Sequence, residues 1–434
     1  MDKMADVLGR AGAWCGQNKY LSAIKNAFQN FMPLTIAGAI GVLWCNVLVN
    51  ETTGLGMFFK PIMALDFLNP AFQAVNFCTI SCITVGITLG IAQEIGVWNM
   101  GAERAGYIPG LVGLAAWLSV TNTSHMVDGA KEAFTGIAGN ELGATGLFTG
   151  MIIGVLSVEL FCFFEKQDAL KIKMPEQVPP GVARAFEVLV PATITLIITA
   201  CIGSACYNLT GLYLNDVIKN GIQGPLGAVG ATIPGVMIIY LVIMLFWLVG
   251  IHGNNMLSAV KEALFTPLAL ENVEAFNKGE TPKNIINMYA LQMWGEFGGS
   301  GVTIGLVIAI MIFGKREDNK AIATLSLVPG LFNINETVTF GIPMVLNPIL
   351  GIPFVFACLV TILVGYVLTV IGFCPVACLT VPWTTPPIVF GFLACGANVM
   401  GAVTQAILIV VSTVIYVPFL ISYEKYQNKQ AAEA

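Results

Sequence analysis

The stretch GIPFVFACLVTILVGYVLTVIGF, residues 351–373, decides the class of fold, because it has the length of a membrane span and carries no charge. It stands inside a longer run, from Thr337 through Tyr423, that contains no Asp, Glu, Lys or Arg. A second run free of these four residue types separates Lys219 from Lys261. A spanning helix needs about 20 apolar residues, and a water-soluble chain cannot stay dispersed with uncharged runs of this length. The sequence therefore predicts a protein embedded in a lipid bilayer.

The composition of the whole chain points the same way. Of its 434 residues 56% are hydrophobic and 10% are charged, whereas soluble domains carry about 25% charged residues. The net charge of −5 is mild and the sequence holds no basic block, so binding to nucleic acid is excluded. The eleven cysteines lie mostly in apolar runs, where they act as small hydrophobic residues. We therefore expect no metal site, no cofactor and no disulfide framework.

Apolar segments predict an all-α fold with about ten transmembrane helices of about 20 residues each. They cover residues 26–49, 76–95, 106–121, 143–164, 188–212, 227–250, 256–272, 298–314, 351–373 and 400–422. An even number of spans puts the clusters of basic residues on one side, so the positive-inside rule places both termini in the cytoplasm, at an inner membrane, and the loop 122–143 outside. Residues 1–25 lack the apolar core and cleavage site of a secretory signal and are expected to form a cytoplasmic amphipathic lead-in.

Two apolar regions do not read as simple spans. One is Ile251-His252-Gly253-Asn254-Asn255, a polar break that follows a strongly apolar helix. The other, residues 331–353, reads LFNINETVTFGIPMVLNPILGIP and is rich in proline, glycine and asparagine. Broken backbone at membrane depth is tolerated only where protein or a watery cavity supplies hydrogen-bond partners, and transporters place their substrates at such breaks. The sequence thus predicts re-entrant hairpins near residues 251–270 and 331–353.

Two ionisable side chains stand out in these breaks. Glu336 is the only Asp, Glu, Lys or Arg between Lys320 and Glu424, and an intramembrane carboxylate is a functional-site hypothesis by default. His252 is one of two histidines, the other being His125, and an imidazole can donate, accept or shuttle a proton near neutral pH. The alternatives are that Glu336 is solvated at a helix end and that His252 is satisfied by a backbone carbonyl. We take both as candidate catalytic residues.

The neighbouring side chains suit a sugar, because each sugar hydroxyl both donates and accepts a hydrogen bond. The candidate substrate-binding residues are Gly253, Asn254, Asn333, Asn335, Trp383 and Thr384. The indole face of Trp383 can pack on the apolar face of a pyranose ring, but an interfacial tryptophan remains an alternative. Asn254 is equally compatible with a local turn. The run Gly298–Gly301 opens an apolar helix and is best explained by close helix packing.

Several motifs occur in order along almost the whole chain. They are Ala23–Asn26, Met32–Ala39, Val178–Phe186, Gly250–Gly253, Gly298–Gly301, Asn335–Glu336, Phe340–Pro343, Asn347–Pro348 and Pro382–Thr384. Together they resemble the lactose/cellobiose/diacetylchitobiose branch of phosphotransferase system enzyme IIC proteins. The resemblance implies ten spanning helices, two re-entrant hairpins, amphipathic helices and a homodimer. Residues 26–212 would form the dimerising domain, residues 213–423 the sugar-binding transport domain, and residues 424–434 a cytoplasmic tail.

The resemblance also assigns roles to individual residues. His252 and Glu336 match the family's intramembrane histidine and glutamate, which would lie near the sugar 6-hydroxyl that receives phosphate. Trp383 matches a sugar-stacking tryptophan. The sequence stops soon after its last predicted span, so we expect the phosphoryl group to come from a separate phosphorylated IIB protein, charged in turn by a IIA protein.

The function that these features favour is group translocation of a β-linked disaccharide, such as cellobiose, diacetylchitobiose or lactose. The permease would be the membrane subunit of a sugar phosphotransferase. Two rivals use the same polar breaks. An ion-coupled symporter would use Glu336 and His252 as its proton site, and a membrane sensor would bind sugar without moving it. The resemblance favours the first function over both rivals.

Overall fold

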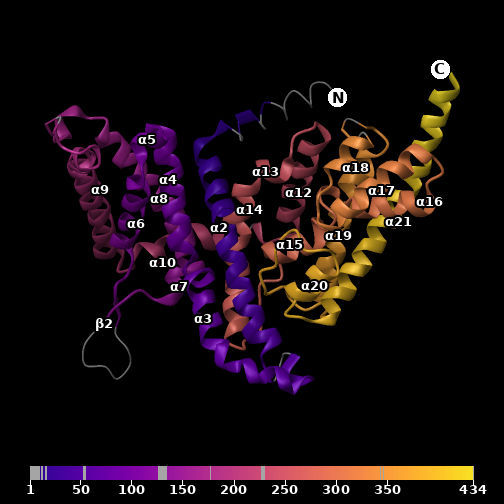
Figure 1. The fold of residues 1–434 in the computed structure, drawn as a ribbon, viewed down its shortest axis with the longest axis horizontal. Coiled ribbons are helices and arrows are strands. Elements are labelled where there is room, and N and C mark those ends of the chain that lie inside the picture. The colour runs from indigo at the N-terminus through magenta and orange to yellow at the C-terminus, as the bar shows by residue number, and fades with distance from the viewer. Residues whose placement is uncertain are drawn as a thin grey trace. The chain divides into compact units, whose positions relative to one another are not determined.

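The computed structural model describes residues 10, 13–14, 17–51, 55–125, 134–175, 177–225, 230–342, 344–345 and 347–433. Most of these residues lie in helices, which confirms the predicted all-α class (Figure 1). Parts of several predicted features lie outside the described residues, namely positions 1–9, 11–12 and 15–16 of the lead-in, 126–133 of the external loop, 227–229 of the span 227–250, Pro343 and Leu346 of the second break, and Ala434 of the tail.

The chain divides into two compact units. The C-terminal unit contains Ala39–Ala74 and Val229–Ala434, and the N-terminal unit contains Gln17–Gly38 and Val75–Ala228. Helix α2 (Lys19–Leu43) therefore starts in the N-terminal unit and ends in the C-terminal one. The roles expected for the two halves, dimerisation and sugar transport, stay predictions.

The N-terminal unit is a helical bundle with one short hairpin. After α2, the elements here are α3 (Asn69–Cys78, shared with the other unit), η4 (Ile80–Cys82), α4 (Ile83–Met100), α5 (Ala102–Ala105), α6 (Ile108–Val120), β1 (Ser124–His125), β2 (Phe134–Thr135), α7 (Gly139–Leu142), α8 (Ala144–Glu165), η5 (Asp168–Leu170), α9 (Pro180–Thr210), α10 (Leu214–Ile218) and η6 (Lys219–Gln223). Strands β1 and β2 pair antiparallel.

The C-terminal unit holds the remaining helices. Its elements are η1 (Trp44–Leu48), η2 (Leu55–Met57), η3 (Lys60–Leu68), α12 (Ile233–Leu248), α13 (Gly253–Met256), α14 (Ser258–Asn277), α15 (Met288–Gly295), η7 (Ser300–Val302), α16 (Ile304–Phe313), α17 (Glu317–Leu331), α18 (Glu336–Gly341), α19 (Gly351–Val370), α20 (Val389–Ala394) and α21 (Val399–Glu433).

Local sequence signals fix where several of these helices begin and end. Helix α9 starts at Pro180, which suits the first turn because that position needs no N–H donor, and it stops before Gly211 in a left-handed conformation. The Thr232 hydroxyl accepts a hydrogen bond from the Gly235 N–H at the start of α12. The Asn287 side chain caps α15 in the same way. Polar caps thus define the ends of helices whose interiors are almost wholly apolar.

Small residues allow close packing in the N-terminal unit. Helices α4, α6 and α8 pack against one another and α9 packs against α6 and α8 (Figure 1). A Cβ on Gly96 would lie 2.2 Å from Pro109, and one on Gly113 would lie 2.3 Å from the Ala92 methyl group. The hydrophobic effect does not drive helices together inside a lipid bilayer. Van der Waals contacts between closely spaced helix backbones stabilise the packing instead.

Helix α21 is central to the C-terminal unit. It packs against α16, α19 and α20 (Figure 1), and the buried Tyr416 hydroxyl donates to the Gly301 carbonyl at 2.8 Å. The Gln405 side-chain oxygen accepts hydrogen bonds from the N–H groups of Ile388 and Gly391. Polar side chains of α21 therefore hold the backbone of η7 and of the first turn of α20 in place.

Membrane-spanning length is reached by six helices among the described residues. They are Lys19–Leu48, Lys60–Met100, Ala144–Glu165, Pro180–Thr210, Gly351–Val370 and Val399–Glu433. The pair Met288–Val302 and Ile304–Phe313, bent by 59°, makes a seventh if it is one span. Ile108–Val120 and Ile233–Leu248 are apolar but shorter. A multi-span protein is confirmed, while the count of ten spans and the two re-entrant hairpins stay predictions.

Candidate functional site

His252 lies in the C-terminal unit, in a short non-helical segment between α12 and α13. Helix α12 ends at Leu248, Gly250 takes a positive φ of 82°, and His252 caps the short helix α13 by accepting the Asn255 N–H on Nδ1 at 3.2 Å. Gly253 permits this turn, because a Cβ there would lie 2.0 Å from the Ile243 carbonyl oxygen. The expected interruption after α12 is therefore present, and it fixes the imidazole.

The structure brings His252 and Glu336 together. Glu336 opens the short helix α18, and its Oε1 lies 3.9 Å from His252 Nε2. The two side chains are 38% and 47% exposed, so both are partly accessible at the surface of the protein. Because Nδ1 accepts a hydrogen bond, a neutral imidazole carries its proton on Nε2, the atom that faces the carboxylate. A proton donor and a proton acceptor thus stand side by side.

The Trp247 ring packs against the His252 imidazole. The two rings lie 4.4 Å apart at an angle of 48°, and the indole is 2% exposed. On its other side Trp247 meets Phe354 of α19 edge to face. Packing of this kind restricts the rotamers of His252 and keeps Nε2 directed toward Glu336.

Residues 296–303 form a segment that we call the glycine joint, since it connects α15 to α16 across their 59° bend. Gly298, Gly299 and Gly301 all have positive φ, a conformation that other residues adopt at a cost. A Cβ on Gly299 would lie 2.5 Å from Asn335. The expectation that this run serves close packing is therefore supported by its geometry.

Asn333 and Asn335 hold this joint in place. The Asn333 side-chain oxygen accepts from the Gly298 N–H, and its amide donates to the carbonyls of Trp383 and Thr385. The buried Asn335 amide donates to the Ser300 carbonyl. These hydrogen bonds fix the breaks relative to one another, and the expected binding of substrate by both asparagines stays a prediction.

Asn254 differs from these two asparagines. Its amide donates to the Ser300 hydroxyl at 3.0 Å, while its buried Oδ1 has no hydrogen-bond partner among the described residues. A buried acceptor left unpaired is costly, so a polar ligand or water belongs at this position. Asn254 therefore has the chemistry expected of a substrate-binding residue.

Trp383 and Thr384 lie in a turn of the irregular segment between α19 and α20, closed by the Thr385 N–H donating to the Pro382 carbonyl. The Trp383 backbone is tied to Asn333, but its side chain is 44% exposed, and Thr384 is half-buried. A large indole exposed beside bound backbone is available for stacking. Trp117, Trp247 and Trp294 are buried instead.

Sequence reasoning missed a buried charge cluster. Lys261 of α14 forms an ion pair with Glu296 of the glycine joint, and the Tyr240 hydroxyl donates to the same carboxylate at 2.6 Å. Lys261 lies inside the predicted span 256–272 and Glu296 directly before 298–314. Both were charged residues beside apolar runs, and that signal was available in the sequence.

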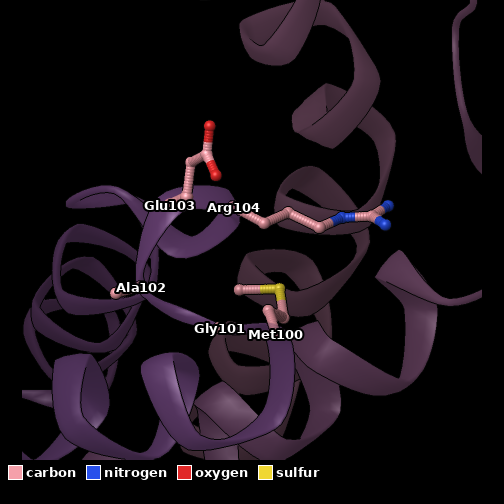
Figure 2. A pocket seen from close by; sticks show the side chains of 5 residues that line it. All are labelled: Met100, Gly101, Ala102, Glu103 and Arg104. Atoms are coloured by element: carbon pink, nitrogen blue, oxygen red, sulfur yellow. The ribbon is translucent and has the colours of Figure 1, made fainter.

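The N-terminal unit contains a separate hollow of about 480 Å³ lined by Met100–Arg104. Figure 2 shows that the Glu103 and Arg104 side chains point in different directions. Arg104 and Arg184 each pair with Glu165 and Glu187 beside it, so positive and negative charges balance. The hollow contains none of the predicted site residues. No group of three His, Cys, Asp or Glu residues suited to a metal occurs in the described part of the chain.

Comparisons with known proteins find relatives that match almost the whole chain. A family model described as "Phosphotransferase system, EIIC" matches residues 25–358. The oligo-beta-mannoside-specific EIIC component of Bacillus subtilis (strain 168) is 33% identical over 98% of this chain and 94% of its own length. The lactose-specific EIICB component of Streptococcus mutans is 28% identical over 96% of this chain and 71% of its own.

A solved structure is similar over the same length. The transporter ChbC, the IIC component from the N,N'-diacetylchitobiose-specific phosphotransferase system, aligns with a TM-score of 0.88 and 29% sequence identity. The alignment covers 97% of both chains.

Proposed function

The chain belongs to the phosphotransferase system EIIC family, and we propose that it is the permease that carries a β-linked disaccharide across the membrane for phosphorylation. Cellobiose, diacetylchitobiose and lactose are the candidate substrates, since the relatives are named for sugars of this kind. The single observation that carries the site assignment is the His252–Glu336 pair, half-exposed at two backbone breaks.

The chemistry follows from the two facing groups. The sugar 6-hydroxyl attacks the phosphorus of a phosphocysteine on the IIB partner, forming the O–P bond as the P–S bond breaks and the cysteine thiolate leaves. Glu336 accepts the hydroxyl proton, and the Nε2–H of His252 donates a hydrogen bond that orients the reacting oxygen. Phosphoryl transfer depends mainly on positioning and charge stabilisation, which is what a pair fixed by helix caps can supply.

Sugar recognition is assigned to the groups that the protein leaves free. Asn254 Oδ1 accepts from a sugar hydroxyl, the exposed Trp383 ring stacks on a pyranose face, and Gly253 and Thr384 complete the proposed set of binding residues. Asn333 and Asn335 contribute to sugar binding indirectly, because their hydrogen bonds fix the backbone segments around the site. The negatively charged product no longer fits these neutral partners, which favours its release into the cytoplasm.

The architecture proposed for this function has ten spanning helices and two re-entrant hairpins. The protein lies in a bacterial inner membrane with both termini on the cytoplasmic side. Residues 26–212 form a homodimer, and residues 213–423 move the sugar between the two sides. The partners are a phosphorylated IIB protein and, through it, IIA. The fusion of IIC with IIB in the lactose-specific relative supports a IIB partner that docks at the cytoplasmic mouth.

Uptake into vesicles tests this function against proton symport. Proteoliposomes loaded with phosphorylated IIB are given labelled disaccharide, and the chemical form of the internal label is determined with and without a protonophore. Group translocation predicts sugar phosphate in the lumen, unaffected by the protonophore. Unmodified sugar whose accumulation collapses with the protonophore would establish the symporter instead.

A further inference from the structure

A buried ion pair joins two parts of the proposed sugar site. The side chains of Lys261 and Glu296 are 7% and 18% exposed, and the fully buried Tyr240 adds a hydrogen bond to Glu296 Oε1. The Lys261 ammonium lies 5.5 Å from the centre of the Tyr240 ring. Helices α12 and α14 and the glycine joint therefore meet at a single charged cluster.

Stability alone does not explain this pair. Removing two charges from water is expensive, and well-packed apolar residues of similar volume commonly stabilise a protein as well or better. Ionisable groups inside membrane proteins occur mostly where function requires them. The contacts around the pair indicate what that requirement is.

Each partner lies next to one of the elements that form the site. Lys261 belongs to the helix that follows the His252 break, and its N–H donates to the Leu257 carbonyl. Glu296 is the first residue of the glycine joint, and its carbonyl accepts from the Gly299 N–H at 3.1 Å. The joint continues to Ser300, which receives the Asn254 amide. Both charges also lie within electrostatic range of His252.

We propose that Lys261 and Glu296 are a positioning pair, which holds the His252 break and the glycine joint at the spacing that sugar binding needs. The pair contacts no sugar itself. It acts through Ser300, Asn254 and His252, whose separation changes if α14 moves relative to the joint. This role rests on the proposed function of the chain as a disaccharide permease.

Charge-neutral and charge-swapped variants separate positioning from simple packing. The variant Lys261→Met/Glu296→Gln removes both charges at similar volume, and Lys261→Glu/Glu296→Lys restores a pair with opposite polarity. The matched control is Lys278→Met/Glu274→Gln, which removes an exposed pair at the C-terminal end of α14. Each protein is purified in detergent, checked for a single monodisperse species, and titrated with disaccharide by calorimetry.

The neutral variant should bind disaccharide about tenfold more weakly, since small displacements of positioning groups are enough for such a loss. The KM for sugar phosphorylation should rise by the same factor with little change in turnover. The swapped pair should recover affinity to within about threefold, and the control should match the wild type. Wild-type affinity in the neutral variant, or no recovery in the swapped pair, would overturn the proposal.

The hydroxyl of Tyr240 offers an independent check if the neutral variant does not fold. Tyr240→Phe keeps the buried ring and removes only the hydrogen bond to Glu296, so affinity should fall about threefold, and unchanged affinity would count against positioning. The wild type is titrated first. If it binds no β-linked disaccharide, the proposed function fails, whereas binding that ignores these substitutions removes the positioning pair alone.

Discussion

The Nε2 atom of His252 lies 3.9 Å from Oε1 of Glu336, although the first residue follows α12 and the second begins α18. Each side chain sits at the start of a short helix, where the backbone is already turned away from a regular span. The imidazole is fixed by its bond to the Asn255 N–H and by Trp247. A proton donor and a proton acceptor are thereby held side by side before any sugar binds.

The variant His252→Asn isolates the part of the imidazole that faces Glu336. Asparagine is a good helix cap, so it can still accept the Asn255 N–H while the Nε2 donor is lost. Loss of a positioned donor should lower the rate of sugar phosphorylation about 10- to 100-fold, with a smaller change in sugar affinity. Stopped-flow or quenched assays with phosphorylated IIB would measure it. A wild-type rate in a well-folded variant would exclude His252 from the reaction.

Substitution of Gly253 should cost stability because of a backbone clash. The alanine Cβ would lie 2.0 Å from the Ile243 carbonyl oxygen, so α12 and the break must separate. We expect a loss of about 2–4 kcal/mol, seen as a lower thermal midpoint in detergent and weaker sugar binding. The control is Gly181→Ala on α9, where nothing lies within 4 Å of the new Cβ. Equal midpoints for the two variants would contradict the packing described here.

Asn333 should behave as a structural clamp. Asn333→Asp keeps the acceptor for the Gly298 N–H but loses both donors to the carbonyls of Trp383 and Thr385. Each lost hydrogen bond costs about 1 kcal/mol and a buried unpaired group costs more. The variant should therefore unfold at a lower temperature and bind sugar more weakly. If affinity fell with no change in the thermal midpoint, Asn333 would be a direct sugar ligand.

The exposed ring of Trp383 should contribute to disaccharide binding through its stacking surface and not through a hydrogen bond. Trp383→Phe keeps an aromatic face and should weaken disaccharide binding only about threefold, whereas Trp383→Ala should weaken it about tenfold or more. The protein fold should be unaffected, because the indole is 44% exposed and the clamp from Asn333 reaches only the backbone. Calorimetric titration distinguishes this from an interfacial anchor, for which both variants would bind sugar normally.

The features that could be predicted from the sequence are those that depend on where charged residues occur along the chain. Uncharged runs indicate spans without reference to neighbours, because lipid sets the same requirement everywhere. Against that background His252 and Glu336 stand out as exceptions, and the structure places them together. The polar breaks were equally visible, since glycine and asparagine interrupt apolar helices.

Pairings between distant helices could not be predicted from one sequence. Asn333 and Asn335 were predicted to bind sugar from their local sequence alone. That sequence does not show that their side-chain amides form hydrogen bonds with the backbone of Gly298, Ser300 and Trp383. Lys261 was assigned to an apolar segment because its partner, Glu296, belongs to another helix end. Tertiary hydrogen bonds decide whether a polar residue is free for a ligand, and the local sequence does not record them.

The central claim is that Glu336 accepts the proton when the sugar 6-hydroxyl is phosphorylated. It is tested by single-turnover phosphoryl transfer from phosphorylated IIB to bound disaccharide, comparing the wild type with Glu336→Gln. Glutamine keeps the shape and removes the base, so the account predicts a rate at least about 100-fold lower with sugar affinity changed only a few-fold. Transfer at the wild-type rate by a Glu336→Gln protein that binds sugar normally would contradict it.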